Sequence, residues 1–118
     1  DFPTIEQYSV TFVVDVPSDT SSDAEVYCSS QLNNWQAVDS DYQLSQRSDG
    51  DYEITIQQLP GTSMQFKFTL GPTGDYEMID DSKATQDGFI SDGSGNINRL
   101  YEFNADNQVL NLTVSAWQ

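Results

Sequence analysis

The sequence predicts an all-β domain. Apolar and polar residues alternate with a period of two in several short segments, as expected when side chains point to opposite faces of a strand. Turn-forming residues separate these segments roughly every 8–12 residues, and no segment shows a helical period. This pattern is typical of an antiparallel β-sandwich, immunoglobulin-like in architecture, with about seven or eight short strands.

The first predicted strand, residues 8–16 (YSVTFVVDV), has the clearest pattern. Its apolar side chains share one face: Tyr8, Val10, Phe12, Val14 and Val16. Val13 is the one apolar residue of the opposite face. A second β-rich run follows at residues 24–28, and residues 42–44 predict a short third strand before the turn at residues 48–50.

Two further alternating segments lie on either side of a Leu-Pro-Gly corner. Residues 52–57 place Tyr52, Ile54 and Ile56 on one face, and residues 64–69 do the same for Met64, Phe66 and Phe68. Pro60 lacks a backbone donor and Gly61 favours a turn, so the ladder cannot continue through them. We expect an antiparallel hairpin whose polar face carries Lys67, one of only four basic residues in the chain.

The last third of the chain predicts three strands, at residues 75–79, 97–103 and 109–114, with a turn at residues 104–107. Residues 80–96 are rich in Asp, Ser and Gly and have no clear period. Cys28, the single cysteine, lies in a strand-like run and is expected to be a small buried apolar residue.

Length and charge restrict the function. The 118 residues form one domain, residues 1–118, with a formal charge of −15 from 19 acidic and four basic residues. The negative electrostatic potential of such a charge repels phosphate backbones and anionic lipid, so nucleic acid and membrane surfaces are not expected partners. No apolar run is long enough to span a bilayer, and the first residues do not resemble a signal peptide. A mature, processed start and a domain cut from a longer protein would both look this way, and we expect the cut domain.

The composition also argues against catalysis. The chain has no histidine, and this removes the usual general base and the commonest metal ligand. Paired carboxylates could act as acid and base, but a glycosidase needs a deep cleft that a small domain has little room to form. We therefore expect a protein that is not an enzyme and carries no cofactor.

The acidic segment before the seventh predicted strand raises the question of calcium. Residues 92–97 resemble the middle of an EF-hand loop, but its first and last ligand positions fall on Ile90 and Tyr101, which cannot coordinate calcium. The sequence therefore excludes an EF-hand. It leaves open an irregular calcium site, or a solvated acidic loop, built from Asp80, Asp81, Asp87 and Asp92.

Trp35 and Tyr76 are the best candidates for a binding surface. Trp35 follows a turn-forming Asn-Asn pair, and Tyr76 follows a Gly-Pro-Thr-Gly turn. Sugar rings present flat C–H faces that stack on aromatic rings, and their hydroxyls bond to short polar side chains. The alternative is that both residues are ordinary core aromatics.

An ordered set of short motifs along nearly the whole chain resembles the starch-binding domain family, carbohydrate-binding module family 20, and the related glycogen-binding domains of family 48. The motifs are Val10-Thr11-Phe12, Asn33-Asn34-Trp35, Leu59-Pro60-Gly61, Phe66-Lys67-Phe68, Tyr76-Glu77, Asn98-Arg99 and Trp117-Gln118. No single motif is specific to the family; the resemblance rests on the order and spacing of the whole set.

The resemblance implies a non-catalytic β-sandwich that binds α-1,4-glucans and is attached to a glucan-active enzyme. Trp35 and Tyr76 match the two aromatics on which the family stacks the sugar. The polar positions of that site match Lys67, Glu77 and Asn98. Some members have a second site, near which Tyr42 and Tyr52 fall.

This sequence departs from the family pattern in three places. The loop before Trp35 reads CSSQLNNW, with Cys28 and Ser29 in place of Gly-Asn, and Tyr76 replaces a tryptophan. Residues 78–97 form an insertion where the family has only a few residues. The insertion could reshape the site, cover it or change the sugar recognised.

We therefore expect a secreted or cell-surface carbohydrate-binding module whose partners are an α-glucan and a covalently attached catalytic or surface domain. Two alternatives remain from the sequence. One is a structural or protein-interaction module that has lost sugar binding. The other is a calcium-binding acidic surface module.

Overall fold

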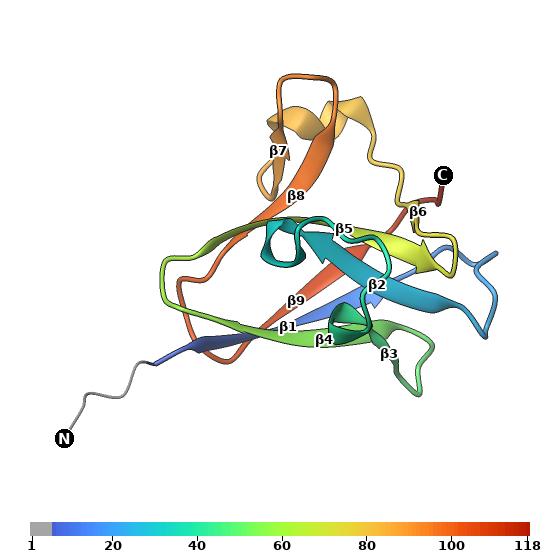
Figure 1. Ribbon diagram of the computed structural model, residues 1–118, viewed down its shortest axis with the longest axis horizontal. Helices are drawn as coiled ribbons and strands as arrows, with labels where there is room; N and C mark the ends of the chain where they lie inside the picture. The colour runs from blue at the N-terminus through green and yellow to red at the C-terminus, as the bar shows by residue number, and fades with distance from the viewer. Residues whose placement is uncertain (1–5) are drawn as a thin grey trace.

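The computed structural model describes residues 6–118, which fold as two packed β-sheets (Figure 1). One sheet has four strands in the order β3-β4-β1-β9; the other has five, with β2-β5-β8-β7 in order and β6 paired to β5. The strands are β1 Tyr8–Asp15, β2 Glu25–Ser30, β3 Ser45–Gln46, β4 Tyr52–Gln58, β5 Ser63–Gly71, β6 Asp75–Tyr76, β7 Phe89–Ser91, β8 Ile97–Glu102 and β9 Gln108–Thr113. The predicted all-β sandwich is confirmed, although residues 6–118 form nine strands.

Three short 3-10 helices connect the strands: η1 Gln31–Asn33, η2 Ser40–Tyr42 and η3 Asp81–Thr85. Within residues 6–118, no helix has the length and apolar character needed to cross a membrane. Part of the N-terminal stretch that we compared with a signal peptide, residues 1–5, lies outside the described residues.

Strand β1 runs through the middle of the four-stranded sheet. It pairs antiparallel with β4, so that Val10 lies opposite Ile56, and parallel with β9. Val10, Phe12 and Val14 are buried, as the alternation of residues 8–16 predicts. Val13 on the opposite face is buried too.

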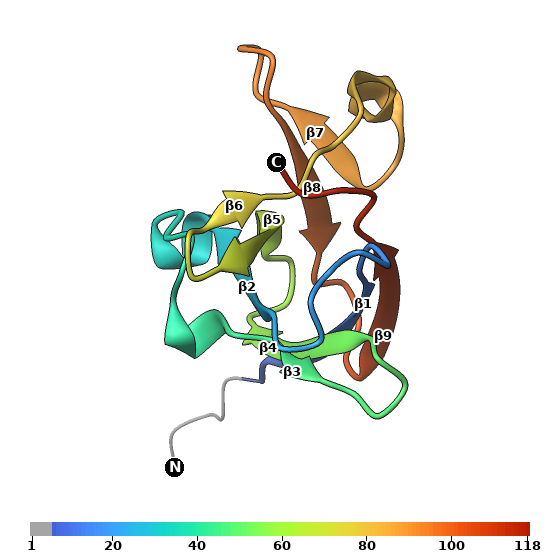
Figure 2. The same ribbon diagram turned by 90° about the vertical axis from the view of Figure 1, so that its right-hand side faces the viewer.

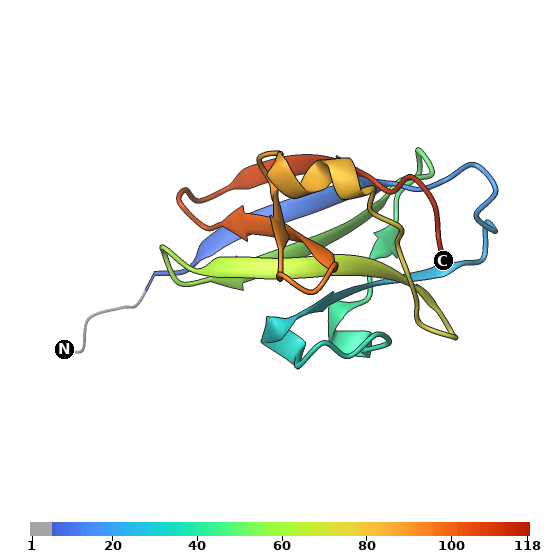
Figure 3. The same ribbon diagram turned by 90° about the horizontal axis from the view of Figure 1, so that it is seen from above.

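The five-stranded sheet is built around β5, whose Met64, Phe66 and Phe68 point into the sandwich and are buried. β2 pairs with one edge of β5, and β8 and β6 share the other edge. Seen from above, β1 (blue) and β9 (red) lie on one side, and β2 (cyan) and β5 (yellow-green) lie on the other (Figure 3).

The core lies between the sheets and takes side chains from both. Phe12 and Phe66 meet across it with ring centroids 5.2 Å apart. Cys28 belongs to this core, which confirms the prediction that it is a buried apolar residue, and its burial raises the pKa of the thiol.

The predicted hairpin of β4 and β5 is wrong. β4 pairs with β1 and β3, whereas β5 pairs with β2, β6 and β8. The Pro60-Gly61 corner carries the chain from one sheet to the other, and the Gly61 N–H donates to the Phe103 carbonyl at 2.8 Å. Both strands turn apolar faces to the same core from opposite sides, and this produces the same alternation as a hairpin.

Three other segments differ from the prediction. The strand expected at residues 75–79 is limited to β6, Asp75–Tyr76. Ser40–Tyr42 forms η2, and the short strand expected at residues 42–44 lies at Ser45–Gln46 instead. The insertion, residues 78–97, contains η3 and β7 although it has no clear period. β7 pairs with β8, and Figure 2 shows this hairpin and η3 rising above the rest of the sandwich.

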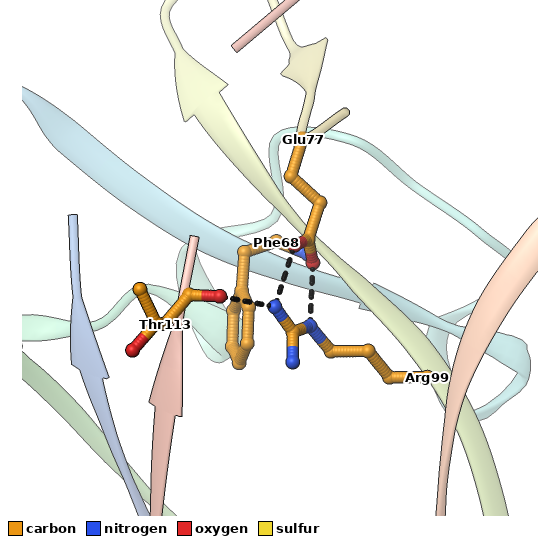
Figure 4. Close-up of polar contacts among 4 residues, drawn as sticks. All are labelled: Phe68, Glu77, Arg99 and Thr113. Atoms are coloured by element: carbon orange, nitrogen blue, oxygen red, sulfur yellow. Dashed lines mark hydrogen bonds and ion pairs between the residues drawn. The ribbon is translucent and has the colours of Figure 1, made fainter. Parts of the chain in front are cut away.

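Glu77 and Arg99 form a buried ion pair beside the edge of β5, at the point where the partner of β5 changes from β8 to β6 (Figure 4). Arg99 Nε donates to Glu77 Oε2 at 2.9 Å, and Nη2 donates to Oε1 at 2.8 Å. Glu77 Oε2 also accepts the Phe68 N–H of β5 at 2.9 Å, and Arg99 Nη2 reaches the Thr113 carbonyl of β9 at 2.7 Å. The pair thus ties strands of both sheets together.

Replacing Glu77 by Ala should lower the free energy of unfolding by about 3–5 kcal/mol, because Arg99 would remain as a buried, unpaired charge. Urea denaturation at neutral pH measures the change. Glu53→Ala is the matched control: Glu53 pairs with Arg47 at 3.6 Å on the surface, and its loss should cost no more than about 1 kcal/mol. Equal costs for the two variants would contradict the structural role of Glu77.

Candidate functional site

A shallow pocket of about 500 Å³ lies on the outer face of the five-stranded sheet. It is lined by Trp35, Gln65, Lys67, Tyr76, Asp92, Asn96, Asn98 and Gln118. Four of the five residues predicted to bind the ligand are among them. The pocket therefore gathers residues from distant parts of the chain onto one surface.

The loop after β2 displays Trp35. Ser30 caps η1 through its side chain, and the buried Asn33 amide accepts the Ser30 N–H at 3.0 Å while donating to the Cys28 carbonyl at 3.3 Å. Asn34 and Trp35 then both adopt a left-handed backbone, each with φ of 58°. The Trp35 side chain remains 36% exposed, so it is not a core residue.

The backbone of Trp35 is unfavourable for a bulky side chain. The left-handed region costs an L-residue about 1–2 kcal/mol, and strained residues of this kind concentrate at functional sites. A hydrogen bond from the Trp35 N–H to the Ser30 carbonyl at 2.8 Å holds the conformation. The loop therefore keeps a large aromatic ring at a position whose backbone conformation favours glycine.

Tyr76 stands next to this loop. Its strand β6 pairs with β5, with Tyr76 opposite Thr69. The Tyr76 hydroxyl donates to the Trp35 carbonyl at 3.3 Å and lies 3.3 Å from Ser29 Oγ. These contacts fix the tyrosine ring relative to the tryptophan loop.

The floor of the pocket is polar. Gln65 and Lys67 alternate with the inward residues of β5 and so point outward. Asn98 of β8 donates to Gln65 Oε1 at 3.3 Å, and its own amide oxygen accepts no described hydrogen bond. The Lys67 ammonium lies 5.9 Å from the centroid of the Tyr76 ring. Donors and acceptors thus lie beside the aromatic rings.

Glu77 does not belong to this surface, and the expectation that it bonds the ligand is corrected. Its side chain is 1% exposed, and both carboxylate oxygens are engaged by Arg99. Because Tyr76 points outward, the next residue of the extended chain points inward. The motif places the tyrosine, not the glutamate, at the pocket.

Tyr42 and Tyr52, expected near a second site, do not form a pair of exposed aromatic rings. The Tyr52 ring is 2% exposed within the core, and its hydroxyl donates to the Ala24 carbonyl at 3.0 Å. Tyr42, in η2, packs partly buried against the same core. Strand β4 turns Tyr52 inward together with Ile56, so its face is not available to a ligand.

The sequence missed four residues of the pocket: Gln65, Asp92, Asn96 and Gln118. Asp92 and Asn96 lie in the turn between β7 and β8, within the insertion. The only signal in the sequence was the departure from the family spacing, and it could not place the turn. The insertion contributes one wall of the pocket, through Asp92 and Asn96, and leaves the pocket open.

Two of the acidic residues considered for calcium, Asp80 and Asp92, accept hydrogen bonds within their own turns. Hydrogen bonds from Ser82 to the Asp80 carboxylate lower the pKa of Asp80, and the same carboxylate caps η3. Hydrogen bonds from Ser94, first through its hydroxyl, lower the pKa of Asp92 to about 2. Residues 6–118 contain no group of three or more acidic or cysteine side chains that could hold a metal ion.

The chain is similar to part of an α-amylase. It is 34% identical over 110 residues to an α-amylase of Niallia circulans, a match that covers 93% of this chain and 8% of that protein. No protein-family model matches the chain. The chain therefore corresponds to a small part of this relative.

Solved structures share the fold. A family 15 glucoamylase from Hypocrea jecorina aligns with a TM-score of 0.63 at 20% identity, over 95% of this chain and 17% of that one. A γ-CGTase from alkalophilic Bacillus clarkii aligns with a TM-score of 0.53 at 18% identity, over 93% and 15%. The class is thus a small β-sandwich domain found within larger enzymes. This chain is homologous to a part of α-amylase, in agreement with the starch-binding domain family that its motifs resemble.

The left-handed backbone at Trp35 gives a test of the loop. Trp35→Gly should be more stable than Trp35→Ala by about 1 kcal/mol, because glycine adopts positive φ without the steric cost that alanine bears. Urea denaturation compares the two variants. Val38, exposed in the same loop and without positive φ, is the matched control, and Val38→Gly should instead be less stable than Val38→Ala. The same order at both positions would contradict the loop conformation.

Proposed function

We propose that this domain is a non-catalytic carbohydrate-binding module that binds α-glucan and holds an attached enzyme at its substrate. The observation that carries the proposal is the meeting of Trp35 and Tyr76 at one pocket, although 41 residues separate them. One ring is exposed on a loop, and the other is held beside it by a hydrogen bond from the Tyr76 hydroxyl to the Trp35 carbonyl. Such a pair can stack on the C–H faces of a sugar chain.

The polar groups of the pocket suit a neutral ligand. The Lys67 ammonium can donate to sugar oxygens, and the Asn98 amide can both donate and accept. The pocket also contains the carboxylate of Asp92, so it carries charges of both signs. A polyhydroxylated chain with no net charge satisfies such a set, whereas a strongly charged ligand would meet one repulsive group.

The relatives support the choice of glucan and the accessory role. Their names, α-amylase, glucoamylase and CGTase, denote enzymes of α-glucan chemistry, and the matches cover only 8–17% of their lengths. The proposed partners are therefore an α-glucan such as starch, glycogen or a maltooligosaccharide, and a covalently attached catalytic or surface domain. The proposal includes a secreted or cell-surface location, since starch supplied from outside the cell is a polymer too large to enter it.

One observation favours a second candidate, a structural or protein-interaction module without sugar binding. The Lys67 ammonium lies over the Tyr76 ring, so one face of that ring is already partly occupied. If this contact persisted, Trp35 would be the only free platform. The two candidates differ in a direct binding measurement.

Affinity electrophoresis tests the proposal in native gels cast with amylose, glycogen, laminarin, xylan or no polysaccharide. Amylose and glycogen should retard the domain, and laminarin and xylan should not. Trp35→Ala should weaken retardation about 30-fold or more in apparent affinity, because removal of an aromatic anchor typically costs about 2 kcal/mol or more.

The control for this substitution is Val109→Ala, which removes an exposed apolar side chain from the other sheet and should leave retardation unchanged. Melting curves should show both variants folded, whereas removing a core tryptophan would cost about 3–5 kcal/mol. Unchanged mobility of the wild-type domain in every gel would refute sugar binding and favour the structural module.

A further inference from the structure

Pairing of β7 with β8 places the turn between them beside Asn98, one of the polar residues that line the pocket. Ile90 of β7 lies opposite Asn98 of β8, and Ser91 lies opposite Ile97. Asp92 directly follows β7, Asn96 directly precedes β8, and both residues line the same pocket as Asn98. Figure 2 shows the hairpin, in orange, rising beyond β5 and β6. The turn is therefore a wall built on the strand that carries a floor residue.

The hydrogen bonds within the turn leave one oxygen of Asp92 for a ligand. Oδ1 accepts from the Ser94 N–H at 2.8 Å, from the Ser94 hydroxyl at 2.6 Å and from the Asn96 N–H at 3.3 Å. None of the described hydrogen bonds involves Oδ2. The Asn96 amide donates to Ser94 Oγ at 3.4 Å, and its own oxygen accepts none of them.

Asp92 and Lys67 line one pocket without forming an ion pair among the described residues. The two charged groups therefore line the same pocket of about 500 Å³ without neutralising each other in a direct contact. A carboxylate accepts hydrogen bonds from hydroxyls, and an ammonium donates to hydroxyl or ring oxygens. Groups of both kinds, placed apart, can hold successive units of one polyhydroxylated chain.

The sheet order gives the length of this site. Trp35 follows β2 and Asp92 follows β7, and these strands are the two ends of the order β2-β5-β8-β7. Three strand spacings separate them, about 14 Å in all. This distance exceeds the length of one hexose, so a sugar stacked on Trp35, at the β2 end of the sheet, does not itself reach the turn at the β7 end.

We infer that Asp92 and Asn96 bind a second part of the same glucan chain and make the site selective for longer oligosaccharides. This inference rests on the proposed function and extends it to the insertion. The aromatic pair holds one end of the bound segment. The Asp92 Oδ2 atom and the Asn96 amide oxygen accept hydrogen bonds from hydroxyls of a sugar further along the chain.

Isothermal titration calorimetry with maltose and maltoheptaose tests the inference. Asp92→Asn keeps Oδ1, which holds the turn, and replaces the ligand-facing Oδ2 by an amide that donates. It should weaken maltoheptaose binding about tenfold or more and leave maltose binding unchanged, as expected for one lost hydrogen bond to a charged group. Asn96→Ala should weaken only the longer sugar as well.

Asp87→Asn is the matched control. It makes the same change in charge within the insertion, at an exposed residue outside the pocket, and should bind both sugars as the wild type does. Wild-type affinity of Asp92→Asn for maltoheptaose would overturn the inference and leave the proposed function intact. Equal weakening for maltose would overturn the assignment to a distant sugar. Binding of neither sugar by the wild type would refute the proposed function and, with it, this inference.

Discussion

The bidentate pair between Glu77 and Arg99 is the interaction on which the five-stranded sheet depends. The edge of β5 is shared by β8 and β6, and the change of partner would leave the Phe68 N–H without a strand to accept it. The Glu77 carboxylate accepts this N–H, and Arg99 neutralises the carboxylate and reaches the Thr113 carbonyl in the other sheet. Loss of either partner would leave a buried charge, and this is why the pair must remain whole.

The same pair orients the candidate site. Neighbouring residues of an extended chain point to opposite faces. With Glu77 turned inward, Tyr76 faces the pocket, and with Arg99 turned inward, Asn98 does so as well. The guanidinium lies 5.5 Å from the Phe68 ring and 5.4 Å from the Phe89 ring, so it also anchors the insertion. The ion pair between Glu77 and Arg99 therefore positions Tyr76, Asn98 and strand β7, which leads to the turn that contains Asp92.

The sequence was sufficient to predict the strands with a long alternating pattern, such as β1. It also identified four residues that line the pocket: Trp35, Lys67, Tyr76 and Asn98. Local alternation reports which face of a strand is buried, but not which strand is its neighbour, and for this reason β4 and β5 were wrongly paired. Motif matching located Tyr76-Glu77 but could not tell that its glutamate serves an internal ion pair. β7 escaped prediction because a strand of three residues is too short to show a period. Its place is set by pairing with β8.

NMR titration of the ¹⁵N-labelled domain with maltoheptaose would locate the glucan site, because the spectrum reports which amides the sugar perturbs. We expect shifts at the Trp35 indole N–H and at the amides of Lys67, Tyr76 and Asn98. Amides of the four-stranded sheet, such as those of Thr55 and Val109, should not move. Shifts centred on Tyr52 and Leu44, or no shifts at saturating sugar, would contradict the assignment of the glucan site to the pocket beside Trp35.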